Sequence, residues 1–147
     1  MNYGQYRKSV VAIAPASVAS NATAGLDIDT RGARRVRINV IVPTTTAALS
    51  TLKVQAGDTT TSYADVVALT GGTAVGSAAG FVIPTFNSAA ATLISFSVNK
   101  LNVPQRYLKL QITPAAAAII AADAELYDNE HDILTPTQQG VSAHVIV

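Results

Sequence analysis

Apolar and polar residues alternate along most of this chain, and the alternation predicts β-strands. In residues 34–42, Val36 and Ile38 would lie on one side of a strand and Arg35 and Arg37 on the other. A period of two is typical of a strand with one buried face. The same pattern predicts eight or nine strands, at residues 8–14, 22–29, 34–42, 51–56, 63–69, 81–83, 93–99, 107–113 and 119–127.

The clearest local unit is residues 51–66, TLKVQAGDTTTSYADV. Leu52 and Val54 share one face of a first strand, a polar turn follows, and a second strand begins at Tyr63. Alternation on both sides of a polar turn is the pattern of a β-hairpin. This segment therefore indicates an all-β fold.

Prolines mark the ends of several predicted strands. The apolar segments are followed in turn by Pro15, Pro43, Pro84, Pro104 and Pro114. Because proline has no N–H to donate to a sheet ladder, it belongs at strand ends and edges. The spacing of the prolines therefore supports the predicted strands.

For two of the predicted strands, the sequence raises a further question: which residues of 22–29 face inward, and whether 119–127 is a strand or a helix. In residues 22–29 we expect Leu26 and Ile28 to face inward. Residues 119–127 follow an alanine-rich stretch, and a helix is the alternative there because alanine has the highest helix propensity. The acidic residues of this segment nevertheless recur at a period of two, which favours a strand.

The elements together predict a β-sandwich or jelly roll, since short strands recur without a convincing long helix. Residues 9–128 are interpreted as one sandwich domain, because a chain of 147 residues can bury a single core. Residues 1–8 and 129–147 show little alternation and are interpreted as extended terminal arms. Residues 71–80, GGTAVGSAAG, are interpreted as a flexible loop.

The composition suits a protein that covers much of its surface with other protein. Charged residues make up 13% of the chain, whereas about a quarter is usual for a soluble domain. An oligomer or a larger assembly is therefore expected. The chain has no cysteine, so it can form neither a disulfide nor a thiolate metal site.

The sequence predicts no membrane segment and no leader peptide. No apolar run approaches the ~18 residues of a membrane helix, so no membrane partner is expected. The apolar run at residues 10–14 is shorter than the ~7–15 residues at the centre of a secretory signal. We interpret it as the first strand of an uncleaved chain.

Charge is distributed unevenly along the sequence. All ten Lys and Arg lie within residues 1–109 together with four acids, and the other five acids lie within residues 110–147. These five acids are Asp123, Glu125, Asp128, Glu130 and Asp132. A solvated surface is one interpretation. The other is that the acidic end contacts a basic face of a neighbouring subunit, because complementary charge steers association and sets register.

Nucleic-acid binding is a hypothesis for the densest basic group, which consists of Arg31, Arg34, Arg35 and Arg37. The net charge of +1 and the low aromatic content speak against it, because single-stranded nucleic acid is usually held by basic grooves with aromatic side chains for stacking. We interpret the group as a protein interface or a solvated face, and we expect no nucleic-acid partner.

Patterns typical of catalysis or cofactor binding are absent. The glycine-rich loop lacks the Lys-Ser/Thr of a phosphate-binding loop, and no serine stands in a nucleophile-elbow context. His131 lies near several acids, but no glycine provides the turn of a calcium loop. We therefore expect no enzymatic activity, no cofactor and no metal site.

Several segments resemble a known family, the head decoration or cement proteins of tailed bacteriophages. The resemblance spans residues 25–127, and it depends on ARRVRINV at 33–40, TLKVQ at 51–55, Gly57-Asp58, YADV at 63–66 and RYLKL at 106–110. In that family a strand like TLKVQ, a polar turn and a Tyr/Phe-x-Asp-Val strand recur. Here the turn carries Thr59, Thr60 and Thr61 where an Asp/Gly-rich turn is usual, which leaves open which virion role the chain fills.

The resemblance implies a β-sandwich that sits on the outer surface of an icosahedral capsid, commonly as a homotrimer. Such a protein is made in the host cytoplasm and clamps neighbouring major capsid subunits against internal DNA pressure. It needs no active site, because its work is done by its surface and its arms. We expect the contacts to involve both arms and the outward charged faces, that is Tyr3, Tyr6, Arg7, Lys8, Arg35, Arg37, Asp123, Glu125, Asp128, Glu130 and Asp132.

Two alternatives remain. The first is another phage virion component, such as a head–tail connector, a tail protein or a fibre-base protein. The second is a carbohydrate-binding β-sandwich module. The chain has no Trp and only five Tyr, which weighs against the second alternative because sugars usually stack on exposed aromatic rings.

Overall fold

The computed structural model describes residues 8–45, 47–127 and 143–147, and this part of the chain is all-β. It contains ten strands in two sheets and no helix, so the predicted β-sandwich class is confirmed. The strands are β1 (Lys8–Val18), β2 (Asp27–Asp29), β3 (Arg35–Val42), β4 (Leu49–Thr59), β5 (Ser62–Gly72), β6 (Phe81–Val82), β7 (Thr92–Asn99), β8 (Tyr107–Pro114), β9 (Ala118–Tyr127) and β10 (Ala143–Ile146).

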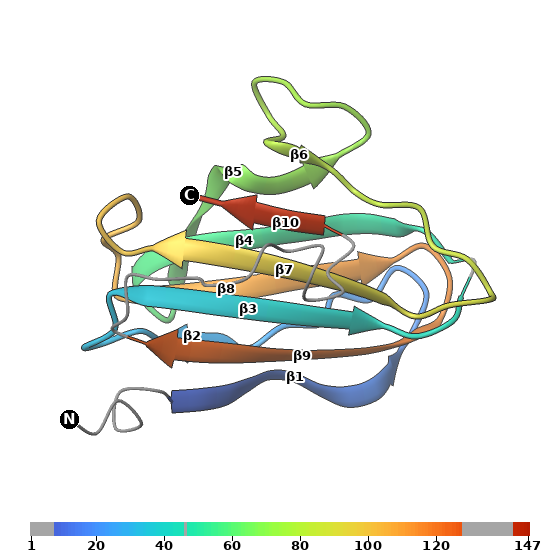
Figure 1. Ribbon diagram of the computed structural model, residues 1–147, viewed down its shortest axis with the longest axis horizontal. Coiled ribbons are helices and arrows are strands. Elements are labelled where there is room, and N and C mark those ends of the chain that lie inside the picture. Colours follow the sequence, from blue (N-terminus) through green and yellow to red (C-terminus); the bar gives the residue numbers. More distant parts are fainter. Residues whose placement is uncertain (1–7, 46, 128–142) are drawn as a thin grey trace.

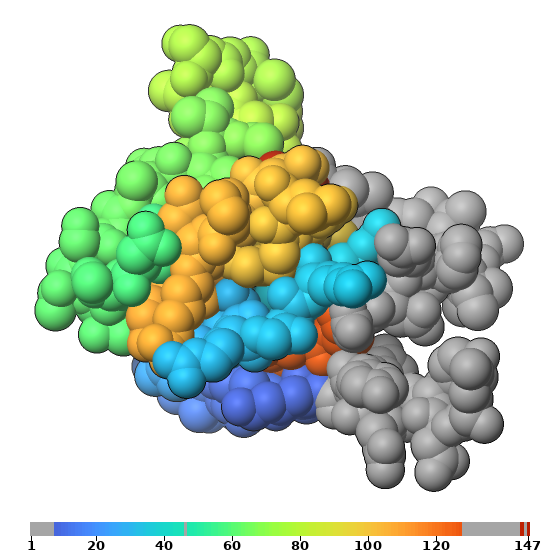
Figure 2. All heavy atoms as spheres, turned by 90° about the vertical axis from the view of Figure 1, so that its left-hand side faces the viewer, coloured from blue at the N-terminus to red at the C-terminus, as the bar shows by residue number. Residues whose placement is uncertain are grey.

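The strands form two layers, which Figure 1 shows one behind the other. The first sheet has the order β1-β9-β3-β7-β10, and the second sheet has the order β2-β8-β4-β5-β6. The glycine-rich loop between β5 and β6 projects from one side of this body (Figures 1 and 2).

Four antiparallel pairs are nested within one another along the chain. The innermost pair is β4 with β5, and β3 with β7, β2 with β8 and β1 with β9 surround it in turn. Nested pairing arises when one long hairpin is rolled up. Strands that are far apart in the sequence, such as β1 and β9, thereby become neighbours.

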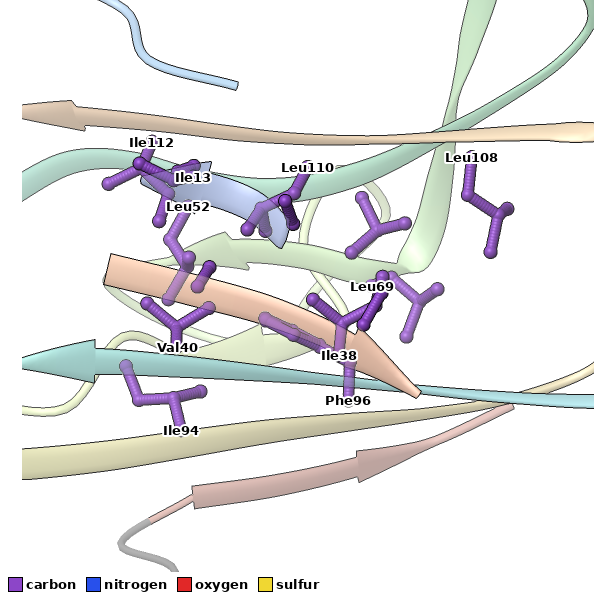
Figure 3. Close-up of a cluster of buried hydrophobic side chains, with 14 of the residues drawn as sticks. Ile13, Ile38, Val40, Leu52, Leu69, Ile94, Phe96, Leu108, Leu110 and Ile112 are labelled. Atoms are coloured by element: carbon purple, nitrogen blue, oxygen red, sulfur yellow. The ribbon is translucent and has the colours of Figure 1, made fainter. Parts of the chain in front are cut away.

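The core lies between the two sheets and is built by the alternating residues of both. Val36, Ile38 and Val40 of β3 are fully buried, as are the inward residues of β8. Figure 3 shows Ile38 and Val40 of β3 in one cluster with Leu108, Leu110 and Ile112 of β8. Phe96 of β7 packs edge-to-face on Phe81 of β6 within this core, with ring centroids 5.5 Å apart.

The second strand is shorter than predicted, and the expectation for Leu26 is wrong. Of residues 22–29 only β2 and an isolated bridge between Ala24 and Ile112 pair with β8. Leu26 is 55% exposed, whereas Ile28 is buried as expected. Between bridge and strand, the backbone of Gly25 approaches β8 so closely that a Cβ would lie 2.0 Å from the carbonyl oxygen of Leu110. The regular alternation stops at this close approach, and Leu26 points outward.

The alanine-rich segment forms a strand, as the period-two pattern favoured. β9 pairs with β1 on one side and with β3 on the other, so it is a central strand of the first sheet. Ile120, Ala122 and Ala124 face the core. Pairing with two neighbours outweighs the helix propensity of the alanines, because propensity contributes only a few tenths of a kcal/mol per residue.

The two ends of the chain differ in part from the predicted arms. Residues 1–7 and 128–142 lie outside the described part. Lys8, predicted as the last residue of the N-terminal arm, begins β1. The predicted C-terminal arm, residues 129–147, ends in a strand of the sandwich, because β10 pairs in parallel with β7. The side chains of Val145 and Val147 pack against the core. The sequence did not reveal this strand, because a segment of four residues is too short to show a clear alternation of apolar and polar positions.

Candidate interaction surface

Four of the predicted charged residues gather on one face, the outer face of the first sheet: Arg35 and Arg37 lie on β3, and Asp123 and Glu125 lie on β9. Lys8, the first residue of the neighbouring β1, is opposite the core-facing Leu126 in the register and therefore does not share that face. The other predicted contact residues lie outside the described part of the chain: Tyr3, Tyr6, Arg7, Asp128, Glu130 and Asp132.

Opposite charges stand side by side within this sheet. Arg37 is directly opposite Glu125 in the register of β3 and β9, and Asn39 is opposite Asp123. Opposite charges at facing positions of an antiparallel pair stabilise a sheet by about 0.2–1 kcal/mol. The sheet therefore gives Glu125 a basic neighbour within its own chain. The expected contact between the acidic end and a neighbouring subunit stays a prediction.

A chain of hydrogen bonds orders the centre of this face. The Nε of Arg37 donates to the Oγ of Ser95 over 2.9 Å, and Ser95 Oγ donates to Asn39 Oδ1 over 3.0 Å. Because Ile94 and Phe96 on either side of Ser95 face the core, Ser95 points toward the outer face of the sheet, yet it is fully buried. The hydrogen bonds hold the Arg37 side chain in one orientation. Such a preorganised donor loses less side-chain entropy when it binds a partner.

An apolar patch adjoins these polar residues. It consists of Val11, Ile41, Leu93, Ile119 and Ala121, and Ile41 lies between Ala121 and Leu93 in the register. Val11, Ile41 and Ile119 are 56%, 45% and 57% exposed. Sequence reasoning missed the patch, although the alternation that turns Arg37 outward also turns Ile41 outward. An exposed β-branched residue in phase with charged ones was the available signal.

The outer face of the second sheet carries a different set of groups, joined by ion pairs. Arg106 donates two hydrogen bonds to the carboxylate of Asp29, from Nε to Oδ1 over 3.1 Å and from Nη2 to Oδ2 over 2.7 Å. Lys53 lies 2.9 Å from Asp65, which also accepts a hydrogen bond from Gln55 over 2.6 Å. All of these residues except Asp29 belong to the motifs on which the family resemblance depends, and here they hold neighbouring strands together.

The two tyrosines of this face each have a cation against the ring. Lys109 Nζ lies 5.2 Å from the ring centroid of Tyr63, and Arg106 Cζ lies 4.7 Å from that of Tyr107. Burial and the nearby Asp27 carboxylate raise the pKa of Tyr63 to about 12. Because cations already occupy ring faces, these tyrosines are poorly suited to stack on a sugar.

The Asp29–Arg106 pair predicts a pH-dependent contribution to stability. Hydrogen bonds from Arg106 lower the pKa of Asp29 to about 2 from an ordinary value of 3.8. A carboxyl whose pKa is lower in the folded state stabilises the fold above its unfolded pKa, and this contribution is lost as the pH falls toward the folded pKa. We expect Asp29→Asn to melt at a lower temperature than the wild type near neutral pH.

That difference in melting temperature should shrink between about pH 4 and pH 2 and then vanish. Thermal unfolding followed by circular dichroism across this range measures it. Arg106→Gln, which removes the other partner, should show the same trend. A difference that persisted at the lowest pH would show that Asp29 acts through its shape and not through its charge.

Among the described residues no three His, Asp or Glu side chains come together as a metal site, and His131 lies outside them. No helix long and apolar enough to cross a membrane occurs in the described ranges. Comparison of the chain with protein-family models, with curated proteins and with solved structures found no match. Evidence on function therefore comes from the surface and from the sequence resemblance.

Proposed function

We propose that this protein is a non-catalytic structural component of a phage virion that decorates the outside of the capsid. It would bind across neighbouring major capsid subunits and hold them together. The observation that carries the proposal is the apolar patch on the outer face of the first sheet, lying directly beside the ordered Arg37–Ser95–Asn39 chain.

The patch has the make-up of a protein-binding surface. Protein interfaces typically combine an apolar centre with a polar rim, and arginine is enriched in them. Exposed apolar residues that adjoin one another mark binding sites more often than scattered ones do. Ile41 with its neighbours supplies the apolar part, and Arg37 and Asn39 supply directed polar groups at its border.

The connectivity of the sandwich supports the same class of function. We infer from the four nested pairs that the sandwich is a jelly roll, which is a fold of viral capsid and lectin domains. Between these two uses, the sugar-binding one is disfavoured by the cations that lie against Tyr63 and Tyr107. The resemblance to decoration proteins favours the viral one.

Many weak contacts would suffice for this role. When one shell displays many identical sites and the protein itself forms an oligomer, simultaneous engagement raises the overall affinity without any new contact. The low charge content of 13% is consistent with a surface that other protein covers. We propose a homotrimer that joins the virion after synthesis in the host cytoplasm, with the major capsid protein as its partner.

Cosedimentation tests the proposal directly. The full chain is mixed with expanded empty heads purified from the virus whose genome encodes it, and free capsid subunits serve as the control. We expect saturable binding to heads and none to free subunits, because a clamp needs two adjacent subunits. Absence of binding to heads at saturating protein would overturn the proposal. Binding at a single vertex, with few copies per particle, would favour the head–tail connector alternative.

A further inference from the structure

We propose that the edge of β7 is a docking slot for the C-terminal strand of this chain, and that a second copy of the chain can supply that strand. Copies would thereby be linked by strand exchange. The inference does not rest on the proposed function, since it concerns contacts between copies and needs no capsid.

The slot is defined by backbone hydrogen bonding along one edge. β10 pairs in parallel with β7 from Ala143, opposite Ile94, to Ile146, opposite Ser97. The last residue extends the pairing, because Val147 N donates to the Ser97 carbonyl over 3.1 Å and Asn99 N donates to Val147 O over 2.8 Å. Without β10 this edge of β7 would present unpaired groups, and such an edge readily takes up another strand.

Apolar side chains add to this pairing. Val145 is opposite Phe96 in the register, and Val145 and Val147 both pack against the core. β10 also contacts β5, so it closes the side of the sandwich between β7 and β5. Figure 1 shows β10 along that side, with the C-terminus beside β5. Main-chain bonds and alternate side chains in pockets are the two elements of recognition by strand addition.

The end of β9 and the start of β10 are far apart in the first sheet. β9 and β7 are both antiparallel to β3, and β10 is parallel to β7, so β9 and β10 point the same way. The end of β9 and the start of β10 are therefore at opposite ends of the sheet. With a rise of ~3.3 Å per residue and a strand spacing of ~4.8 Å, they are about 20–25 Å apart.

The connecting residues, 128–142, can reach about twice that distance. Fifteen residues separate β9 from β10, and an extended chain spans up to ~3.3–3.6 Å per residue, or about 50 Å. A strand on a connection with this much excess length can enter the same slot on an adjacent copy. The bonds inside the slot would be identical, which is why exchange of identical elements is a low-cost route to oligomers.

Disulfide trapping tests the exchange, and the absence of cysteine from the chain makes the design simple. One batch carries Ser97→Cys, and a second batch with a distinguishing tag carries Ile146→Cys. These positions are register partners in β7 and β10, and adjacent strands bring Cα atoms within the ~4.4–6.8 Å that a disulfide bridges. Because each variant has one cysteine, a bond between positions 97 and 146 can form only between two chains.

The two batches are refolded together, oxidised and separated without reductant. We expect the mixed dimer of both variants to exceed, by about tenfold or more, that obtained when Ser88→Cys replaces Ser97→Cys, because the slot raises the effective concentration of the two thiols. Ser88 is exposed and lies outside the strands. The double variant Ser97→Cys/Ile146→Cys controls for geometry, since it can close in either arrangement.

Each outcome bears on the proposal. Mixed dimer well above the Ser88→Cys control supports exchange. If the double variant closes within single chains but the mixed batches give no more dimer than that control, the strand is held by its own chain and the proposal is wrong. If the double variant fails to close at all, β10 does not occupy the slot and the proposal is also wrong. None of these results alters the capsid-binding test.

Discussion

Replacement of Phe96 by alanine is expected to lower the free energy of unfolding by about 3–5 kcal/mol. Phe96 is fully buried in the middle of β7 and packs edge-to-face on Phe81 across the sandwich. It is also the register partner of Ile38 in β3 and of Val145 in β10. The truncation therefore leaves a cavity where both sheets and the last strand meet.

Urea unfolding followed by circular dichroism measures this loss, provided that the m value stays unchanged. Leu101→Ala is the control, because Leu101 is 88% exposed and its truncation should change stability by no more than about 0.5 kcal/mol. A loss below about 1 kcal/mol for Phe96→Ala would show that the aromatic pair is not part of the core.

The second large effect is expected on binding. Ile41→Asp should weaken binding to expanded heads by about tenfold or more, because a charge at the centre of an apolar contact must be desolvated without a partner. The folded state should tolerate the change, since Ile41 is already 45% exposed. Its effect on the free energy of unfolding should be about 1 kcal/mol or less.

Cosedimentation at a series of protein concentrations gives the change in affinity, and a melting curve confirms folding. Val82→Asp is the matched control, because Val82 is 52% exposed and lies on β6 of the second sheet. Equal losses for both variants would mean that the apolar patch is not the binding face. No loss for Ile41→Asp would place the contact elsewhere.

Local pattern alone was enough to predict most of the strands. In β3 and β8 every second residue is buried and pairs with neighbours on both sides, so alternation and burial agree. The pattern failed at Leu26, because the interruption there comes from the close approach of Gly25 to Leu110, a residue far along the chain. It also missed β10, whose four residues become a strand only through pairing with β7.

The candidate surface was predictable only in part. The charges of Arg37 and Glu125 were visible in the sequence, but their position opposite one another depends on the pairing of β3 with β9. Likewise, the apolar patch exists because Ile41, Ala121 and Leu93 come from three strands that the fold brings together. No local pattern encodes such a juxtaposition.

The sequence by itself determined that this chain is an all-β sandwich, because the alternation of side chains across a strand is a local property of the backbone. It also determined which residues face outward in the regular strands. Only the tertiary structure decided which strands are neighbours, and with them the outer face of the first sheet and the slot at the edge of β7. The reason is that strand pairing joins residues distant in the chain, and its free energy comes from contacts that exist only once the sheets are formed.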